Sequence, residues 1–416
     1  MLENLLISLF VVFLNFVVAY TLRAIHKTWL APSALYALWW SVTTLVSTLV
    51  GYRETIPVSG LLWILFSSIL IGVGSLIFLP NYTVNKIPDP ISQNNLTKAN
   101  MYLLRKIYIL ALFLGLLYIV LLLIFQKQPL KDFTTLEGYL LLAAKFSKER
   151  YEDNVVLPMY IKLLLPFVFF ASCLGGILFS VIGEKKYLLC FIPSIIISTI
   201  FTEKSSILFC LTMWLGGYLS LQLFNKQIIL FRFSTVIKII ATTSVVGAIL
   251  VLSAFARMGN IDAGLVNDVI DKLYSSLFGH IAAFSNWLST YDVQNETLYF
   301  GKYSFAGIFE FFGISKRDQG LYTVNYQLAN GEMTNLYTIH KGLILDYSIS
   351  GTLVIYLVFG IFSQIIFQTI YRKNIKLMGL LCLIYSITFV SPFVSILIFN
   401  TTFLAVIMSV LVFLLL

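Results

Sequence analysis

The chain has 416 residues, of which 59% are hydrophobic and only 11% are charged, and its mean hydropathy is +0.91. Soluble globular chains are about half apolar and about a quarter charged, so this composition excludes an ordinary water-soluble fold and calls for lipid as the solvent. The net charge of +9 does not indicate nucleic-acid binding, because the Lys and Arg residues lie in short gaps between apolar runs and not on one amphipathic face. Contact with anionic lipid head groups is an additional role open to some of them.

Apolar runs predict about eleven transmembrane helices, so the expected fold class is all-α: a polytopic transmembrane helical bundle with a long, partly helical extracytoplasmic loop. Residues 1–22 have no preceding basic region and no clear cleavage site, and we interpret them as the first span. The span 336–370 exceeds one crossing, which predicts a tilt or a projecting N-terminal part. The turn in 391–402 is marked either by Ser391-Pro392 or by Asn400-Thr401-Thr402. The predicted spans are 4–22, 30–50, 59–79, 107–126, 158–182, 187–202, 205–223, 235–256, 336–370, 375–391 and 393–416.

The short loops predict the orientation, because every odd-numbered loop is basic and basic loops stay in the cytoplasm. The N-terminus is then expected outside and the C-terminus inside. Three regions follow: 1–256 with spans 1–8 and an outer loop at 127–157, the long outer loop 257–335, and 336–416 with spans 9–11. The basic residues that carry this argument are Arg23, Lys27, Lys86, Lys98, Arg105, Lys106, Lys185, Lys186, Lys226, Arg232, Arg372, Lys373 and Lys376.

The outer loop 127–157 carries a helix signal. Thr134 and Glu137 have the spacing of a capping box, apolar residues recur behind them at helical spacing, and Lys145 and Glu149 form an i,i+4 charge pair. The pattern fits an amphipathic helix on the outer leaflet or a surface helix that packs on the bundle.

The outer loop 257–335 is the longest polar stretch and is rich in acids and aromatic residues, with a predicted helix from Leu273 to Leu288. Long ordered loops of this kind are usually functional. Aromatic faces beside carboxylates and amides suit sugar rings, which have apolar C–H faces and hydroxyl rims. The alternative is a structured cap that binds no ligand.

Charged side chains at membrane exits are candidates for function because charge near lipid is costly. Glu203 and Lys204 lie between two apolar runs on the predicted outer side; the alternative is a simple turn with snorkelling charge. Arg257 ends the eighth span, where its guanidinium could hold a lipid diphosphate or anchor the helix at the interface.

A third group spans residues 333–350. At 100° per residue, a helix here would put Asn335, Thr338, Gly342, Asp346 and Ser350 on one polar stripe facing the bundle interior or a wet cavity. Asp346 would pair with a base to structure the bundle, or orient a base. Lys341 lies near the edge of the stripe.

His340, on another face of that helix, and His280, in the long loop, are candidate general bases with a structural role as the alternative. The four cysteines, Cys173, Cys190, Cys210 and Cys382, lie in apolar runs and form no CxxC pair, so we expect buried helix residues. We find no nucleotide-binding loop, no metal-ligand cluster and no nucleophile elbow, and we expect no cofactor and no metal.

Several motifs in residues 200–360 resemble those of the bacterial oligosaccharide repeat-unit polymerases, also called O-antigen polymerases, and the topology extends the resemblance to most of the chain. The motifs are residues 203–206 (EKSS), the Gly/aromatic helix 278–287, the Gly-Lys-x-x-Phe-x-Gly stretch 301–307, and Asn-x-Tyr-Thr at 335–338 followed by 346–351 (DYSISG). The chain differs from the family in having Lys341 where Arg is frequent and Tyr347-Ser348 where Phe-Gly is frequent. The family's paired long-spacing Arg motifs have no clean match.

The resemblance implies a reaction at the extracytoplasmic face. The growing glycan would leave undecaprenyl diphosphate and join a hydroxyl of the next lipid-linked repeat. Arg257 and Lys204 would neutralise the leaving diphosphate, and Glu203, His280 or His340 would deprotonate the acceptor. Arg317, Lys341, Asn335, Asp346 and Lys302 are candidates for substrate binding.

The expected partners are undecaprenyl-diphosphate-linked oligosaccharides and membrane lipids, with a chain-length regulator and a flippase implied by the resemblance alone. Two alternatives stay open. An O-antigen ligase shares the donor but transfers the glycan to a different final acceptor. A lipid-oligosaccharide flippase or other transporter would be expected to have more spans, short outer loops or inverted repeats.

Overall fold

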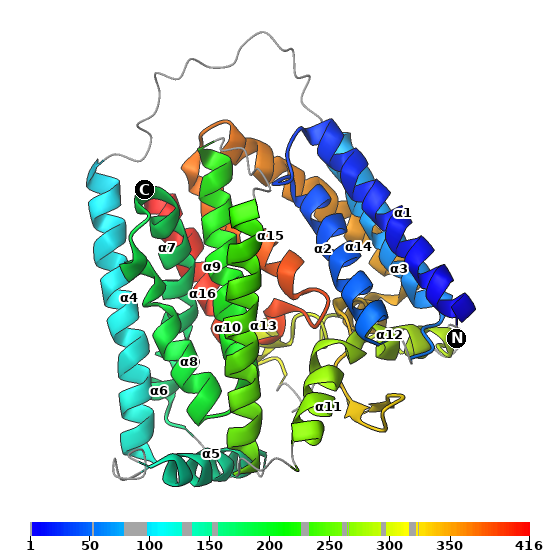
Figure 1. Cartoon of the computed structure of the whole chain (residues 1–416). Coiled ribbons are helices and arrows are strands. Elements are labelled where there is room, and N and C mark those ends of the chain that lie inside the picture. The colour runs from blue at the N-terminus through cyan, green and yellow to red at the C-terminus, as the bar shows by residue number, and fades with distance from the viewer. Residues whose placement is uncertain are drawn as a thin grey trace. The chain divides into compact units, whose positions relative to one another are not determined.

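The computed structural model describes residues 2–51, 54–78, 98–126, 135–151, 157–225, 233–259, 264, 266–292, 297–315, 322 and 324–416, with the backbone alone for 2, 98, 150, 151 and 233–243. Its regular structure is almost entirely helical (Figure 1). Within these ranges the strands are limited to β1 (Tyr326–Gln327) and β2 (Met333–Thr334), which pair antiparallel. Seven of the described helices are long and apolar enough to cross a membrane. The prediction of an all-α membrane bundle is confirmed.

The distribution of side chains is that of a protein solvated by lipid. Phe10 and Phe13 of α1 (Leu2–His26) are each 60% exposed, whereas Ser41 and Thr44 of the neighbouring α2 (Pro32–Val50) are buried. If these exposed aromatic rings faced water, they would contribute no hydrophobic free energy to folding. Between helices in a bilayer, small and hydroxylated residues permit close packing and hydrogen bonds, so the apolar surface faces outward.

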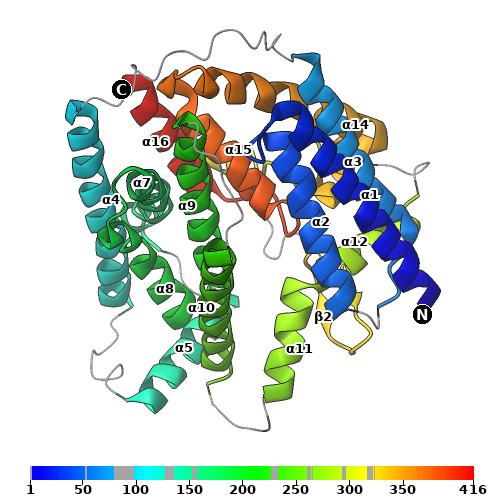
Figure 2. The same ribbon diagram turned by 45° about the horizontal axis from the view of Figure 1, so that its top comes forward.

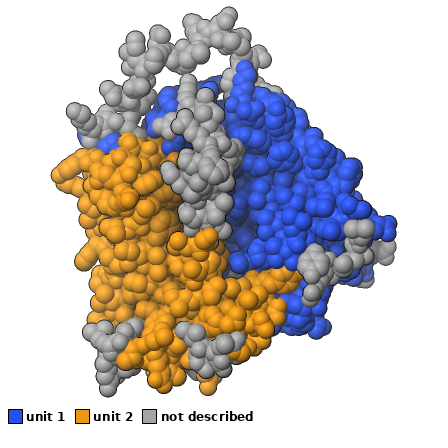
Figure 3. Space-filling view, viewed as in Figure 1, with its two compact units in different colours: residues 1–101, 222–227, 275–416 blue, residues 102–221, 228–274 orange. Residues whose placement is uncertain are grey.

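The chain divides into two compact units, coloured separately in Figure 3 and described one at a time below. Unit 1 comprises residues 1–101, 222–227 and 275–416. In it α1, α2 and α3 run side by side (Figures 1 and 2), and the strongest packing is between α3 and α14. Its elements are α1, α2, α3 (Val58–Ile77), α12 (Gly279–Ser289), α13 (Ala306–Phe311), β1, β2, α14 (Ile339–Tyr371), α15 (Met378–Val390) and α16 (Asn400–Leu415).

Unit 2 comprises residues 102–221 and 228–274, so α4, α9 and α11 each extend a few residues beyond it. Here α10 packs on α5 and on α8. Its elements are α4 (Lys98–Phe125), α5 (Leu136–Tyr151), α6 (Met159–Lys162), α7 (Leu165–Ile182), a 3-10 turn (Lys185–Leu188), α8 (Phe191–Ile200), α9 (Lys204–Phe224), α10 (Phe233–Met258) and α11 (Val266–Leu277).

Helix α14 differs from the single helix that the sequence predicts. It begins at Ile339, so Asn335 lies before the helix and Thr338 is its N-terminal cap residue. The helix is broken at Ser348, which has φ 66° and ψ 175°. The predicted polar stripe is therefore wrong at both ends, because Asn335 precedes the helix and Ser350 lies beyond the break, whereas Thr338, Gly342 and Asp346 are buried as expected.

Three other boundaries depart from the expected ones. The predicted span 187–202 contains α8, whose ten residues extend about 15 Å, too short for a helix to cross the hydrocarbon alone. The predicted loop helix 273–288 is two helices, α11 and α12, separated at Phe278. In 391–402 both candidate turn sequences lie at helix ends, because α15 ends at Val390, just before Ser391-Pro392, and α16 begins at Asn400.

Within each unit, hydrogen bonds join segments that the charge pattern assigns to the cytoplasmic side. In unit 1 the side chains of Gln368 and Lys373, at the end of α14, donate hydrogen bonds to the carbonyl oxygens of Phe78 and Phe224. In unit 2 the Tyr108 hydroxyl, near the start of α4, donates to the carbonyl oxygen of Lys186 (3.2 Å). Segments assigned by charge to one side of the membrane thus meet in space.

Candidate functional site

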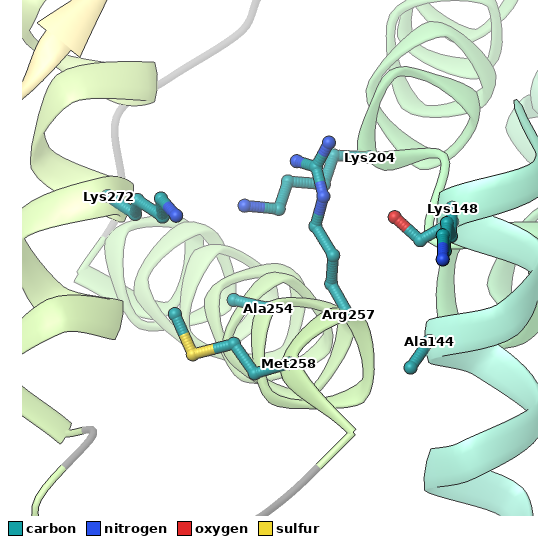
Figure 4. Close-up of a pocket in the computed structure, with 8 residues that line it drawn as sticks. Ala144, Lys148, Lys204, Ala254, Arg257, Met258 and Lys272 are labelled. Atoms are coloured by element: carbon teal, nitrogen blue, oxygen red, sulfur yellow. The ribbon is translucent and has the colours of Figure 1, made fainter. Parts of the chain in front are cut away.

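A pocket in unit 2 collects four basic side chains from four helices (Figure 4). Its volume is about 550 Å³. In the view of Figure 4, Lys204 and Arg257 lie in the centre, with Lys272 on one side and Lys148 on the other. None of the described lining residues is acidic. The site, called the cation pocket below, is lined by Ala144, Ser147, Lys148, Lys204, Ala254, Arg257, Met258 and Lys272.

Lys204 is positioned by a hydrogen-bonded turn that joins α8 to α9. The Ser198 hydroxyl donates to the carbonyl oxygen of Glu203 (3.0 Å) and accepts from the backbone N–H of Ile207 (3.2 Å). The N–H of Ser206 also donates to the Glu203 carbonyl (3.1 Å). Since these bonds satisfy backbone groups at the start of α9, Lys204 occupies its first position in a defined geometry.

Arg257 is positioned by the last turn of α10. Gly259 follows with φ 74°, the left-handed conformation that ends helices and that suits glycine. A side chain at Gly259 would approach the Ala144 methyl group at 3.1 Å, so α5 lies directly against this end of α10. This close approach puts α5, and with it Lys148, at the wall of the cation pocket.

Helix α5 packs on the bundle through one apolar face. Leu140 and Ala143 are buried against Ala256 of α10, and the Tyr139 hydroxyl donates to the carbonyl oxygen of Thr199 (3.0 Å). This favours the surface-helix interpretation of loop 127–157. The cap also differs from the predicted one, because the Thr135 hydroxyl accepts from the N–H of Gly138 (3.1 Å), whereas Thr134 lies outside the described residues.

A second group of candidates surrounds the first half of α14, in unit 1. Lys341 is buried, and its ammonium group lies over the rings of Tyr337, Tyr322 and Trp287, at 3.2, 4.5 and 5.3 Å from their centroids. Cation–π contacts shielded from water each contribute up to about 2 kcal/mol. Trp287 and Tyr322, from residues 257–335, are thereby attached to α14.

Asp346 is fully buried and binds backbone rather than a base. Its carboxylate accepts hydrogen bonds from the N–H groups of Tyr303 (3.1 and 3.2 Å) and Ser304 (2.6 Å). The carbonyl oxygens of Leu345 and Asp346, which the break leaves without helical partners, accept from Tyr299 (3.2 Å) and Phe300 (3.1 Å). Residues 299–304 therefore supply the hydrogen-bond partners that the broken helix lacks at this point.

Both candidate histidines are enclosed by aromatic rings. His340 stacks on Trp40 (4.7 Å between centroids), and its Nδ1 is hydrogen-bonded to the Tyr356 hydroxyl. His280 is 1% exposed and contacts Phe393, and burial lowers its pKa to about 3. A general base works best with a pKa near the ambient pH and within reach of the proton, so neither environment favours that role.

Three other candidates have less defined surroundings. Asn335 is half-buried between β2 and α14, and Lys302 lies in the 299–304 segment, with its ammonium group 6.0 Å from the Tyr303 ring centroid. Arg317 lies outside the described residues. No cluster of three or more His, Cys, Asp or Glu residues that could hold a metal occurs in the described part of the chain.

The structure adds two residues that the sequence did not suggest. They are Lys148 of α5 and Lys272 of α11. Each becomes notable only because α5 and α11 bring it to Lys204 and Arg257. The chain matches no protein-family model, no curated protein and no solved structure.

Proposed function

We propose that the protein polymerises lipid-linked oligosaccharide repeat units, transferring the growing glycan from undecaprenyl diphosphate to a hydroxyl of the next lipid-linked repeat. The observation that carries the proposal is the cation pocket, in which Arg257 and Lys204 lie together with Lys148 and Lys272. Guanidinium and ammonium groups are the usual protein ligands of phosphate oxygens. The motifs in residues 200–360 and the outer-loop aromatic residues are consistent with a glycan substrate.

In the proposed reaction, the acceptor oxygen attacks the anomeric carbon of the donor and the bond from that carbon to the phosphate oxygen breaks. The electron pair stays on the diphosphate, whose charge rises as it leaves. Cations already held in place stabilise that developing charge most effectively, because no reorganisation is needed during the reaction. Glu203, the residue before Lys204 in the chain, is the carboxylate candidate that would accept the hydroxyl proton; it is not among the residues that line the cation pocket.

The proposal includes a setting. The protein would cross the cytoplasmic membrane of a bacterium about eleven times. The cation pocket and residues 257–335 would face the exterior. Two hydrogen bonds, from Tyr108 to Lys186 in unit 2 and from Lys373 to Phe224 in unit 1, join segments that the charge pattern assigns to the same side and so support that part of the assignment. A flippase supplying the repeats and a chain-length regulator would be its partners.

Gene deletion followed by gel analysis of surface glycan tests the proposal. The expected result is collapse of the ladder to single repeats on the final acceptor, restored by the wild-type gene. An unchanged ladder would refute the proposal. Complete loss of surface glycan would instead indicate a ligase or flippase, since neither leaves single repeats on the acceptor.

Complementation with Arg257→Lys tests the role of the guanidinium. We expect loss of most polymer at normal membrane levels, because lysine keeps the charge but cannot form the two-pronged contact with phosphate oxygens. Lys145→Gln is the matched control: Lys145 is an exposed base on α5 that pairs with Glu149 at 3.8 Å and does not line the pocket. Wild-type polymer from Arg257→Lys would remove Arg257 from the mechanism.

A further inference from the structure

Building on the proposed function, we infer that the cation pocket discriminates lipid phosphates by charge, and that Lys148 and Lys272 supply this discrimination. The pocket then binds the released lipid diphosphate more tightly than a lipid phosphate of lower charge, including the glycosylated donor. The consequence is inhibition by the product of the enzyme's own reaction.

The charge difference follows from the chemistry of transfer. The donor is a diester of diphosphate, with one negative charge on each phosphorus. When the anomeric carbon–oxygen bond breaks, the former ester oxygen stays on the terminal phosphate and becomes an ionisable group with a pKa of about 6. At neutral pH the product therefore carries up to one more negative charge than the donor, while the acceptor's proton leaves with the base.

The four basic side chains of the pocket differ in exposure, and we infer different roles from this difference. Arg257 and Lys204 are half-buried at helix ends, whereas Lys148 and Lys272 are exposed at opposite sides of the pocket in Figure 4. An exposed ammonium on a flexible stem acts as a point charge and responds to the total charge of a ligand. The half-buried pair is better placed to fix its geometry.

The two lysines come from elements that are anchored independently. Lys148 lies on α5, which is fixed by Leu140, Ala143 and the Tyr139 hydrogen bond. Lys272 lies on α11, in which Val269 is buried. Because each lysine is exposed and its helix is held by other residues, replacement by glutamine removes the charge and leaves the wall of the pocket in place.

Binding measurements without turnover test the inference. The full chain in phosphatidylcholine nanodiscs would be titrated with farnesyl diphosphate and with farnesyl monophosphate by calorimetry. We expect the wild type to prefer the diphosphate by roughly tenfold or more, a sum of several screened charge contacts. Lys148→Gln with Lys272→Gln should weaken diphosphate binding by roughly threefold to tenfold and monophosphate binding less, so the preference shrinks. Lys145→Gln should leave both unchanged.

The outcomes separate this inference from the proposed function. Equal affinity for the two probes, or a preference unchanged in the double variant, would overturn the charge discrimination while the polymerase could still be supported by its ladder. If the wild type did not bind farnesyl diphosphate, the cation pocket would not be a phosphate site. The charge discrimination and the structural argument for the polymerase would then both fail. Inorganic pyrophosphate is the third probe: binding as tight as that of farnesyl diphosphate would overturn the assignment to a lipid-linked ligand.

Discussion

Ser348 holds a backbone conformation that glycine adopts more readily than any other residue. Its φ of 66° with ψ of 175° falls in a region that costs other residues about 1–3 kcal/mol. Its side chain partly compensates, because the hydroxyl accepts a hydrogen bond from the N–H of Gly351 (3.2 Å) and so caps the second half of α14.

We therefore expect Ser348→Gly to be tolerated, since relief of strain offsets the lost cap. Ser348→Val should lower stability by about 1–3 kcal/mol, because a β-branched residue is strained at positive φ and supplies no cap. Thermal unfolding of the purified protein in nanodiscs measures both. Equal melting temperatures for the Val variant and the wild type would contradict this geometry.

Asp346 is expected to act chiefly as a structural residue. Asparagine has one acceptor oxygen, and its NH2 group would face the N–H groups of Tyr303 and Ser304, so Asp346→Asn should cost about 1–3 kcal/mol. We expect a lower melting temperature together with reduced polymer. Normal stability with complete loss of polymer would instead assign the carboxylate to catalysis.

At the scale of elements, close helix crossings depend on glycine. A Cβ atom on Gly74 of α3 would lie 2.2 Å from the Leu357 carbonyl oxygen, and one on Gly360 of α14 would lie 2.2 Å from the Ile71 carbonyl oxygen. The two helices thus approach through glycines on both sides, as small residues permit in membranes.

Gly360→Ala should accordingly destabilise the protein by about 1–3 kcal/mol, because the backbones must separate to admit the methyl group. Gly247→Ala in α10 is the matched control: apart from the adjacent backbone of its own helix, no described atom lies within 4 Å of the added Cβ, and alanine favours the helix. Melting temperatures of the two variants should move in opposite directions or differ clearly. Similar values would show that the α3–α14 crossing is looser than described.

At the scale of the whole molecule, the membrane orientation can be tested by labelling, because the four native cysteines are buried. Lys145→Cys on α5 should react with a membrane-impermeant maleimide in intact cells. Lys185→Cys, exposed in the 3-10 turn after α7, should react only after permeabilisation. The reverse pattern would invert the proposed topology and put the cation pocket in the cytoplasm.

The sequence by itself determined the class of this protein. Apolar runs of membrane length predicted an all-α membrane bundle, because helix length and hydrocarbon thickness are linked directly and locally along the chain. Arg257 and Lys204 were also recognisable in advance, since a charge at the end of an apolar run stands out whatever the fold. These signals need no knowledge of which helices are neighbours.

The tertiary structure decided which of the charged residues lie together. Lys148 and Lys272 join Arg257 and Lys204 only through the packing of α5 and α11, and nothing in their sequence spacing records it. The break at Ser348 was likewise hidden, because it is stabilised by residues 299–304, which are distant in the chain. The hydropathy of a segment indicates whether that segment lies in lipid or in water. A site and a broken helix depend instead on contacts between residues far apart in the chain, which a local sequence pattern does not contain.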